Sequence, residues 1–335
     1  IRGIAVVFAL LVNALFIFLT AKVDPVSAYS TMFKGAFGNE IYLWSTLKDV
    51  AKLLCIAIAL APAFKMHFWN IGAEGQLLIG ALVTAIVMRN YQTLPSWLLF
   101  LLMFVTAAIG GAIWGIIPAV FKAKWDTNET LFTLMMNYIA IQLVNYFYNR
   151  WKGDHSSLGM INKVSKAGWF PQIMGQRAFL NLVIVTALMF FMYFYLAKTK
   201  HGYEISVVGE SQNTARYAGI NVKAVLIRTM ALSGLICGIC GFMTVAGASQ
   251  TISSASTGGG YGFTAIIVAW LAKFNSFYMA GISIFLVALE KGTALLADKY
   301  ASFNSNASNV VIGVILFSWH RLICTKAPTG AWTFL

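Results

Sequence analysis

Charged residues are scarce in this sequence. They fill 10% of its 335 positions, and acids are the scarcer kind, with 11 Asp and Glu against 24 Lys and Arg. Hydrophobic residues fill 59%, so a soluble globule of this composition would leave far too much apolar surface in water. The apolar runs 3–21 and 97–121 are long enough to cross a bilayer and lack the alternation of transmembrane β-strands. The composition therefore predicts an all-α polytopic membrane protein.

Acids are too few to balance the bases, which leaves a net charge of +13. In a soluble protein this excess would suggest a nucleic-acid partner. Here most Lys and Arg lie at the ends of apolar runs, where their side chains can reach lipid phosphates. No run interleaves aromatic and basic residues as a single-strand binding groove does. We therefore expect membrane lipid, and no nucleic acid, around this chain.

Cysteine and catalytic motifs are also sparse. Cys55, Cys237, Cys240 and Cys324 all lie inside apolar runs, so they cannot form an extracellular disulfide framework, and we interpret the C-x-x-C at 237–240 as two packing residues. The four histidines lack metal-ligand spacing, and the Walker A pattern of a phosphate-binding loop is absent. We expect no catalysis by this chain and no metal or cofactor of its own.

Long apolar runs are what the sequence has in abundance, and they predict about ten transmembrane helices. The two runs that follow glycine-rich interruptions, 76–88 and 262–272, are too short to cross alone. We interpret each as a half-helix completed by an irregular segment, an arrangement that points to a transport pathway. The ten runs are 3–21, 47–64, 76–88, 97–121, 130–148, 179–197, 229–248, 262–272, 277–297 and 309–324.

Charge does not settle the orientation, because about twelve Lys and Arg fall on each side of the ten runs. The basic clusters at 122–124, 198–200 and 321–326 share one side, which we take as cytoplasmic. Both termini then face the cytoplasm. No cleavable signal peptide is evident, and because the first residue is Ile1 rather than Met, we expect residues to precede it.

Two connections between runs are long. The connection 149–177 is rich in glycine and suits a surface loop on the outer side. On the inner side, the connection 198–223 contains Gly202, Gly209 and Gly219 as breaks around a stretch compatible with a short amphipathic helix, 210–218. A helix at this face is a natural docking element for another subunit.

The first interruption, Phe68 to Gln76, places Asn70, Glu74 and Gln76 beside two glycines. An acid inside a membrane suggests a functional site, because it is costly unless it faces a cavity or a partner. The alternative is that Glu74 only caps the N-terminus of the next helix, where negative charge is favoured. The residues alone leave both interpretations open.

The second interruption, Thr257 to Phe263, surrounds Tyr261 with four glycines. Such backbone can present its amide groups to a ligand, or it can serve as a flexible linker. In the fifth run, polar side chains form a stripe within an arc of about 140° on one helical face. The stripe suits a neutral polar solute, or it forms hydrogen bonds that hold helices together. Its members are Asn137, Tyr138, Gln142, Asn145 and Asn149.

Small and charged residues at close spacing have simpler interpretations. The G-x-x-x-G patterns at 111–115 and 234–238 predict close helix contacts. Asp49 and Lys52, three residues apart at the start of the second run, are interpreted as a structural or interfacial ion pair.

Three segments in order resemble a known family. These are Asn70-Ile71-Gly72-Ala73-Glu74-Gly75-Gln76, then Thr133-Leu134-Met135-Met136-Asn137-Tyr138-Ile139-Ala140, then Ala215-Arg216-Tyr217-Ala218-Gly219-Ile220-Asn221-Val222. Together they resemble the permease subunit of bacterial ABC-type nucleoside importers, which is grouped with branched-chain amino acid and ribose permeases.

The resemblance implies one permease domain, 1–335, in the bacterial cytoplasmic (inner) membrane. Two inverted repeat halves, 47–148 and 225–324, would accompany an extracytoplasmic loop at 149–178 and a cytoplasmic coupling loop at 198–223. The implied partners are an ATP-binding subunit that hydrolyses ATP with Mg, a second homologous permease subunit, and a substrate-binding lipoprotein of the basic membrane protein type.

Coupling to the ATPase would run through the third segment. Many relatives have glycine-x-asparagine before the alanine–arginine pair, whereas this chain has Gly209-Glu210-Ser211. The contacts of the coupling segment therefore depart from the family pattern. The residues assigned to coupling are Gly209, Glu210, Ala215, Arg216, Tyr217 and Gly219.

We therefore expect an importer of nucleosides, purine nucleosides foremost, with solute passing between two permease subunits. The alternatives are an ion-coupled secondary transporter of a small polar solute, and an ABC importer of sugars or branched-chain amino acids. The residues expected to line the pathway are Asn70, Glu74, Gln76, Asn137, Tyr138, Gln142, Asn145, Tyr261 and Phe263.

Overall fold

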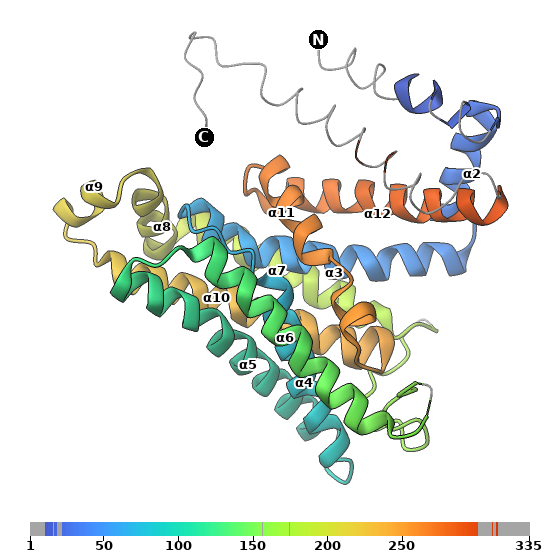
Figure 1. Cartoon of the computed structure of the whole chain (residues 1–335), viewed down its shortest axis with the longest axis horizontal. Coiled ribbons are helices and arrows are strands. Elements are labelled where there is room, and N and C mark those ends of the chain that lie inside the picture. The colour runs from blue at the N-terminus through green and yellow to red at the C-terminus, as the bar shows by residue number, and fades with distance from the viewer. Residues whose placement is uncertain are drawn as a thin grey trace. The chain divides into compact units, whose positions relative to one another are not determined.

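A computed structural model describes residues 11–15, 17–18, 22–155, 157–173, 175–300, 310 and 313. Within these ranges the chain is helical, and the only β pairing is an isolated bridge between Ile173 and Gln176 (Figure 1). The predicted all-α class is confirmed.

Eight of the ten predicted apolar runs coincide with helices. The first run, 3–21, is described only at 11–15 and 17–18, and the tenth, 309–324, only at 310 and 313, so the count of about ten helices in two halves stays a prediction. The eight helices are α3 (Glu40–Lys65), α4 (Ala73–Asn90), α5 (Ser96–Trp125), α6 (Glu129–Lys152), α7 (Ala178–Lys198), α10 (Val222–Met243), α11 (Tyr261–Leu271) and α12 (Ser276–Lys299).

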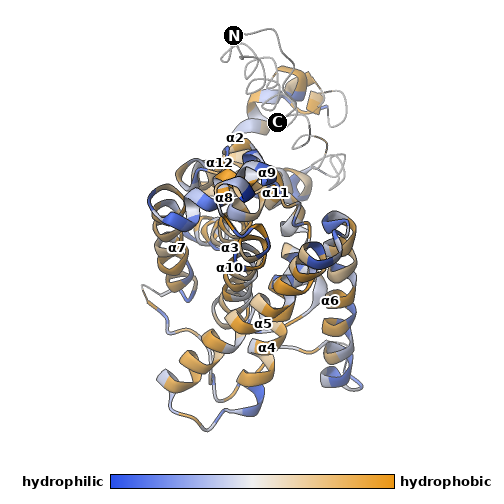
Figure 2. Cartoon of the chain, turned by 90° about the vertical axis from the view of Figure 1, so that its left-hand side faces the viewer, coloured by the Kyte–Doolittle hydropathy of each residue, from blue (hydrophilic) through white to orange (hydrophobic). Residues whose placement is uncertain are grey.

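The described chain also contains five shorter named elements: α2 (Pro25–Phe37), α8 (Lys200–Glu210), α9 (Gln212–Tyr217), and the π-helical turns η1 (Thr244–Ser249) and η2 (Ser254–Gly258). Within the described ranges, four helical stretches are long and apolar enough to cross a membrane. They are Ser96–Trp125, Ala178–Lys198, Val222–Ser249 and Ser276–Lys299. Hydrophobic residues run along the bodies of α4 and α5, whereas hydrophilic residues concentrate near helix ends (Figure 2).

The two short predicted runs form helices of different length. α11 has 11 residues, as short as predicted, and it follows Gly259 and Gly260, both in the left-handed region at φ 66° and 75°. α4 is longer than predicted, with 18 residues, because the Glu74-to-Gln76 stretch forms its first turn and Arg89 and Asn90 extend its end. The irregular backbone of the first break is therefore confined to residues 66–72.

The chain divides into two compact units. The larger unit, Lys48–Gly281, is built around α4, α5 and α10. A Cβ atom on Gly111 would lie 2.7 Å from the Cα of Gly238, and one on Gly80 would lie 2.5 Å from the same Cα. Gly115 approaches Gly234 in the same way, at 3.2 Å. The predicted close helix contacts at both G-x-x-x-G patterns are confirmed, and they pack against each other.

The smaller unit contains residues up to Leu47 and from Ile282 onward. In it, α2 packs against the C-terminal part of α12 through a core that includes Ala28, Met32 and Leu296. A Cβ on Gly292 would lie 2.6 Å from the carbonyl oxygen of Met32, so only glycine permits this approach. Asp24 begins α2 by accepting a hydrogen bond from the Ser27 amide at 2.9 Å.

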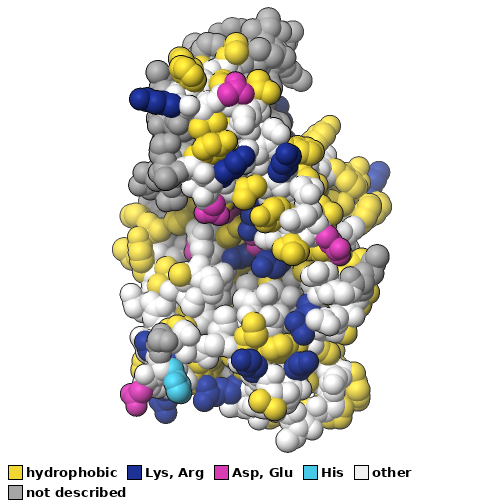
Figure 3. Space-filling model, turned by 90° about the vertical axis from the view of Figure 1, so that its right-hand side faces the viewer, with side chains coloured by type: hydrophobic (Ala, Val, Ile, Leu, Met, Phe, Trp, Pro, Cys, Tyr) yellow, Lys and Arg dark blue, Asp and Glu magenta, His cyan; other side chains and the backbone are white. Residues whose placement is uncertain are grey.

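Cys55, Cys237 and Cys240 are buried with free thiols where α3 packs on α10, and the Sγ of Cys240 lies 3.6 Å from the carbonyl oxygen of Lys52. Their interpretation as packing residues agrees with this burial. Cys324 lies outside the described residues. On the surface, basic side chains are more prominent than acidic ones on the face shown in Figure 3, as the composition requires.

One prediction for the 198–223 connection is wrong. Gly209 does not break the chain before a single short helix. It lies inside α8, where a Cβ would collide with the carbonyl oxygen of Lys65 at the end of α3. Gly209 is therefore required for close packing rather than for a turn. The break comes at Ser211, which separates α8 from α9.

Candidate functional site

Asn70 organises the first break. Its side chain is completely buried, and its Oδ1 accepts hydrogen bonds from the Gly72 amide at 3.0 Å and from Nε2 of Gln76 at 3.3 Å. Its Nδ2 donates to Oγ of Ser233 on α10 at 3.2 Å. A buried amide with this many partners holds the irregular backbone in one conformation. Asn70 and Gln76 are thus together, as predicted, but each is occupied by protein contacts.

Asn137 of α6 holds the start of α4. Its Oδ1 accepts a hydrogen bond from the Gly75 amide at 2.7 Å, and its Nδ2 donates to the Ile71 carbonyl at 2.8 Å. Thr133, one turn earlier, accepts from the Ile71 amide at 3.2 Å. These bonds satisfy the Gly75 amide, which the N-terminus of α4 leaves without a partner, and both backbone groups of Ile71 in the break. The alternative of interhelical hydrogen bonding therefore accounts for Asn137.

We expect Asn137→Leu to destabilise the first break and lower transport, because two buried backbone groups would lose their partners at a cost of about 1–3 kcal/mol each. Asn137→Ser keeps one short polar group, so its stability and uptake should lie between those of wild type and of the leucine variant. The measurement is uptake per folded complex, with the folded amount from size-exclusion chromatography. Unchanged stability together with unchanged uptake would contradict this role.

Glu74 brings the two breaks together. Its Oε1 accepts a hydrogen bond from the amide of Gly260, the N-cap of α11, at 3.0 Å. Glu74 also lies in the first turn of α4, so one carboxylate serves the N-termini of two helices, where negative charge is favoured. A Cβ on Gly258 would lie 2.6 Å from Oε1, and one on Gly262 would lie 2.7 Å from Cβ of Glu74. Glu74 therefore caps α11, whose Gly260 amide donates the hydrogen bond, whereas the sequence suggested that it caps the next helix, α4.

Trp69 gives the first break a second contact with α11. Its ring stacks on Trp270, with centroids 5.4 Å apart and planes at 22°, and it meets Phe64 edge-on at 5.9 Å. Both ends of α11 therefore contact residues of the first break or the first turn of α4. The short helix is fixed at its N-terminus by Glu74 and near its C-terminus by Trp69.

Lys52 of α3 is a site residue that sequence reasoning did not assign to the breaks. Its Nζ donates to the Gly258 carbonyl at 3.2 Å and lies 4.4 Å from the ring centroid of Tyr261. The lysine is nearly buried, at 9% exposure. A buried cation beside a carbonyl and a π face is compensated by both. The sequence signals for Lys52 were its place inside an apolar run and its spacing from Asp49, and neither indicates a contact with the second break.

The members of the polar stripe on α6 differ in burial and in contacts. Asn137 is buried, whereas Gln142 is exposed and Tyr138 is 62% exposed. Asn145 contacts the second break, because its Oδ1 accepts from Oγ of Ser254 at 2.7 Å. Phe263, also predicted to line a pathway, is half exposed.

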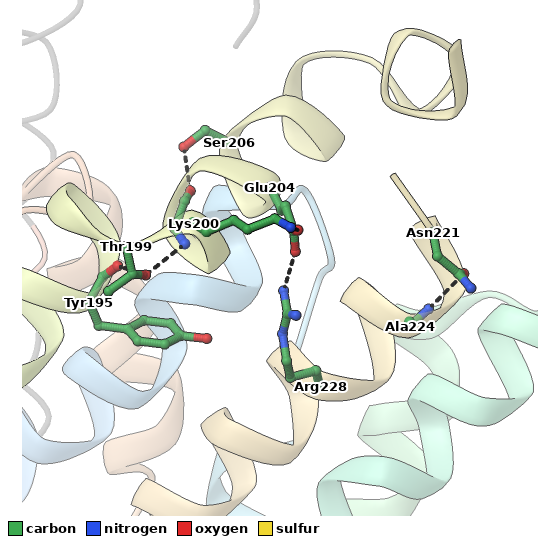
Figure 4. A network of polar contacts seen from close by, with 9 residues as sticks. Tyr195, Thr199, Lys200, Glu204, Ser206, Asn221, Ala224 and Arg228 are labelled. Atoms are coloured by element: carbon green, nitrogen blue, oxygen red, sulfur yellow. Dashed lines mark hydrogen bonds and ion pairs between the residues drawn. The ribbon is translucent and has the colours of Figure 1, made fainter. Parts of the chain in front are cut away.

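A second set of polar contacts fixes α8. Oε2 of Glu204 pairs with Arg228 of α10 at 2.7 Å, and Thr199 caps α8 by accepting from the Gly202 amide (Figure 4). The hydrogen bond from Arg228 lowers the pKa of the Glu204 carboxyl below its ordinary value. The ion pair therefore persists as the pH falls through the ordinary range of glutamate and is lost only below that lowered pKa.

α9 presents the exposed end of the 198–223 connection. Ala215 is buried, whereas Arg216 is exposed and Tyr217 is 94% exposed. Asp126, in the α5–α6 connection, has its pKa lowered chiefly by a hydrogen bond from Lys122 and in smaller part by the charge of Arg216. Arg216 and the α5–α6 connection thus belong to one surface. Among the described residues, no three His, Cys, Asp or Glu side chains gather as metal ligands would.

Comparison with known families places residues 42–319 in the group described as branched-chain amino acid transport system / permease component. The guanosine ABC transporter permease protein of Bacillus subtilis (strain 168) is 30% identical over 317 residues, which are 93% of this chain and 90% of the relative.

Two further relatives differ in the solute for which they are named. A glucose ABC transporter permease protein of Haloferax volcanii is 31% identical over 81% of this chain and 74% of its own length. A nucleoside ABC transporter permease protein of Lactococcus lactis subsp. cremoris is 28% identical over 80% of this chain and 76% of its own length.

Proposed function

Because the chain belongs to the family of permease components of branched-chain amino acid transport systems, we propose that it is the membrane subunit of an ATP-driven ABC importer of nucleosides. The observation that carries the solute class is the match to a guanosine permease, which covers 90% of that relative. The glucose permease is equally similar in identity but is covered over 74% of its length. Because guanosine is a purine nucleoside, purine nucleosides are the first solutes to test.

The finer architecture belongs to this proposal. It consists of about ten transmembrane helices in two inverted halves in a bacterial inner membrane, with both termini cytoplasmic. The eight described helices that coincide with predicted runs support it. So does the contact of one break from each half through Glu74 and Gly260.

The solute pathway lies between this chain and a second permease subunit. The support comes from α6, where Tyr138, Gln142 and Asn149 are exposed within a helix of a membrane protein. Amide side chains are costly against hydrocarbon, so such a face is covered by protein or by water in a pathway. A second permease subunit would cover this face and would enclose a water-filled pathway beside it. Tyr261 and Asn145, at the second break, would shape the same route from within this chain.

Import is powered by ATP hydrolysis on a partner subunit that docks on α9. Arg216 and Tyr217 project from a helix whose Ala215 is buried, and α8 beside it is held to α10 by the Glu204–Arg228 pair. A rigidly held, exposed helix can transmit the motion of a partner to α10. A substrate-binding lipoprotein would deliver nucleoside from the outer side.

Uptake by the complete complex tests the function. The chain would be co-purified with its ATPase, second permease and lipoprotein, and reconstituted in proteoliposomes with internal ATP. We expect uptake of labelled guanosine that excess adenosine inhibits and that glucose and leucine leave unchanged. Inhibition by glucose instead would establish a sugar importer. Uptake that needs no ATP and stops when the proton or sodium gradient is abolished would overturn the ABC assignment.

Arg216→Glu should uncouple uptake from ATP hydrolysis, because it reverses the charge at the centre of the proposed docking surface. We expect uptake to fall at least about tenfold, the effect of losing one charged contact. Folded protein should be unchanged because Arg216 is exposed. Lys34→Glu, an exposed charge reversal on α2 outside the 198–223 connection, is the matched control. Normal uptake in the Arg216 variant would refute the docking role.

A further inference from the structure

A second polar site lies beside the breaks. Within the larger unit, a cavity of about 180 Å³ lies where α3, the first turn of α7, η1 and η2 come together. This volume is many times the roughly 10–15 Å³ that a single water needs. Its polar lining includes Lys48, Asp49, Lys52, Asn181, Ser249 and Ser256. None of these takes part in the contacts of Glu74 or Asn70 described above.

Asn181 shows that the cavity is built to hold a polar group. Its side chain is only 2% exposed, and its Oδ1 has no hydrogen-bond partner among the described residues. A buried amide oxygen without a partner costs about 1–3 kcal/mol, so it is kept only where something else satisfies it. Gly247 allows this position, because a Cβ there would collide with Oδ1. Asn181 therefore places an unsatisfied hydrogen-bond acceptor in the wall of the cavity.

The lining specifies the chemistry of that ligand. Ammonium, carboxylate, amide and hydroxyl groups surround the cavity, and none of the described residues that line it is aromatic. Hydroxyl groups both donate and accept hydrogen bonds, so a ring carrying several of them can use every member of this set. A flat nucleobase would instead be expected to stack on aromatic side chains. The cavity thus suits the sugar part of a solute.

Lys52 connects the cavity with the breaks. It is part of the cavity wall, and its Nζ also contacts Gly258 and the Tyr261 ring. Ser256 belongs to η2, two residues before Gly258. A ligand in the cavity would therefore share a lysine with the segment that Glu74 holds.

We propose that this cavity binds the hydroxylated ring of the transported solute, which is the ribose of a nucleoside. The identification of the solute as a nucleoside rests on the proposed function. The chemistry of the cavity does not, because a hydroxylated ring is also what a sugar would present. The relatives named for guanosine and for glucose share this feature.

Protection of an introduced thiol tests the site. In the complete reconstituted complex carrying Cys324→Ser, Ser256→Cys places a reactive thiol at the cavity, because Ser256 is exposed and the three other cysteines are buried. The rate of its reaction with a membrane-impermeant thiol reagent would be measured. We expect guanosine and free ribose to slow the reaction severalfold and guanine to leave it unchanged. Protection by guanine alone, or by none of the three, would overturn the proposal.

Asn181→Leu supplies the second measurement. The variant should raise KM for guanosine about tenfold, as expected for one lost hydrogen bond to a buried group, while kcat changes little. Protection by ribose should be lost. Thr229→Val is the matched control, because Oγ1 of Thr229 is also buried without a partner in the described part of the chain but lies outside the cavity. If Asn181→Leu does not fold, Ser249→Ala replaces it.

Unaltered KM and unaltered protection in the cavity variants would overturn the proposal even if guanosine is transported. Protection by ribose without nucleoside uptake would instead support the cavity and refute the nucleoside function. The two proposals therefore fail separately.

Discussion

Gly238→Ala should abolish most of the folded protein. A methyl group there would collide with the carbonyl oxygen of Ala107 and lie 3.2 Å from the Cα of Gly111. On the other side, α4 approaches the same residue through Gly80. Both neighbours are backbone, so no side chain can move aside, and the helices must separate. Overpacking costs about 1–3 kcal/mol where side chains can adjust, and we expect at least the upper end here.

The measurement is the monodisperse fraction after extraction in detergent, together with the melting temperature of what remains. Gly281→Ala is the matched control, because a Cβ at Gly281 meets nothing within 4 Å. Both changes add one methyl group to a helical glycine. Equal behaviour of the two variants would show that α4, α5 and α10 can separate without loss of the fold.

The glycine contacts show which part of the helix packing can be predicted from the sequence. Two of the contacting pairs had the G-x-x-x-G spacing, and the prediction of close helix contact was correct for both. Gly80 and Gly241 belong to no such pair, yet they approach α10 and α4 equally closely. A spacing of four marks one helical face, but it does not state which helix packs on it. That choice depends on the tertiary arrangement of α4, α5 and α10.

The two breaks were predictable as breaks, because a polar, glycine-containing stretch before a short apolar run is typical of a broken helix in a membrane protein. Their contact was not predictable. Glu74 and Gly260 are far apart along the chain, and nothing in either segment specifies the other. Lys52 was assigned to Asp49 because only near neighbours can be paired from sequence. Its contact with Gly258 required the folded chain.

The stripe on α6 divides into a packed part and an exposed part. An arc of about 140° is wider than the face that one neighbouring helix covers. Asn137 and Tyr138 are adjacent in sequence, so their side chains point about 100° apart. The first is buried against α4, and the second is exposed. Helical periodicity identifies a polar face, whereas the split between packing and exposure depends on where the neighbouring helix ends.

Glu74→Leu should remove transport while leaving the α4–α5–α10 core folded. The Gly260 amide would lose its acceptor, at a cost of about 1.5–3 kcal/mol for a hydrogen bond to a charged group. The N-termini of α4 and α11 would also lose the carboxylate that both favour. The leucine side chain would then lie against Gly258 and Gly262, and their close approach leaves too little space for its branched methyl groups. We expect α11 to lose its fixed position and uptake to fall below about a tenth of wild type.

Glu74→Gln separates the charge from the hydrogen bond, because glutamine keeps an acceptor oxygen of similar reach but carries no charge. If both the charge and the hydrogen bond contribute, the uptake of this variant should lie between those of wild type and of the leucine variant. Asp154→Asn, which removes an exposed acid from the α6–α7 connection, should leave uptake unchanged. The readout is ATP-dependent uptake per folded complex. Wild-type uptake by the leucine variant would show that the contact between the two breaks is dispensable, and the pathway would then have to be sought along the exposed face of α6.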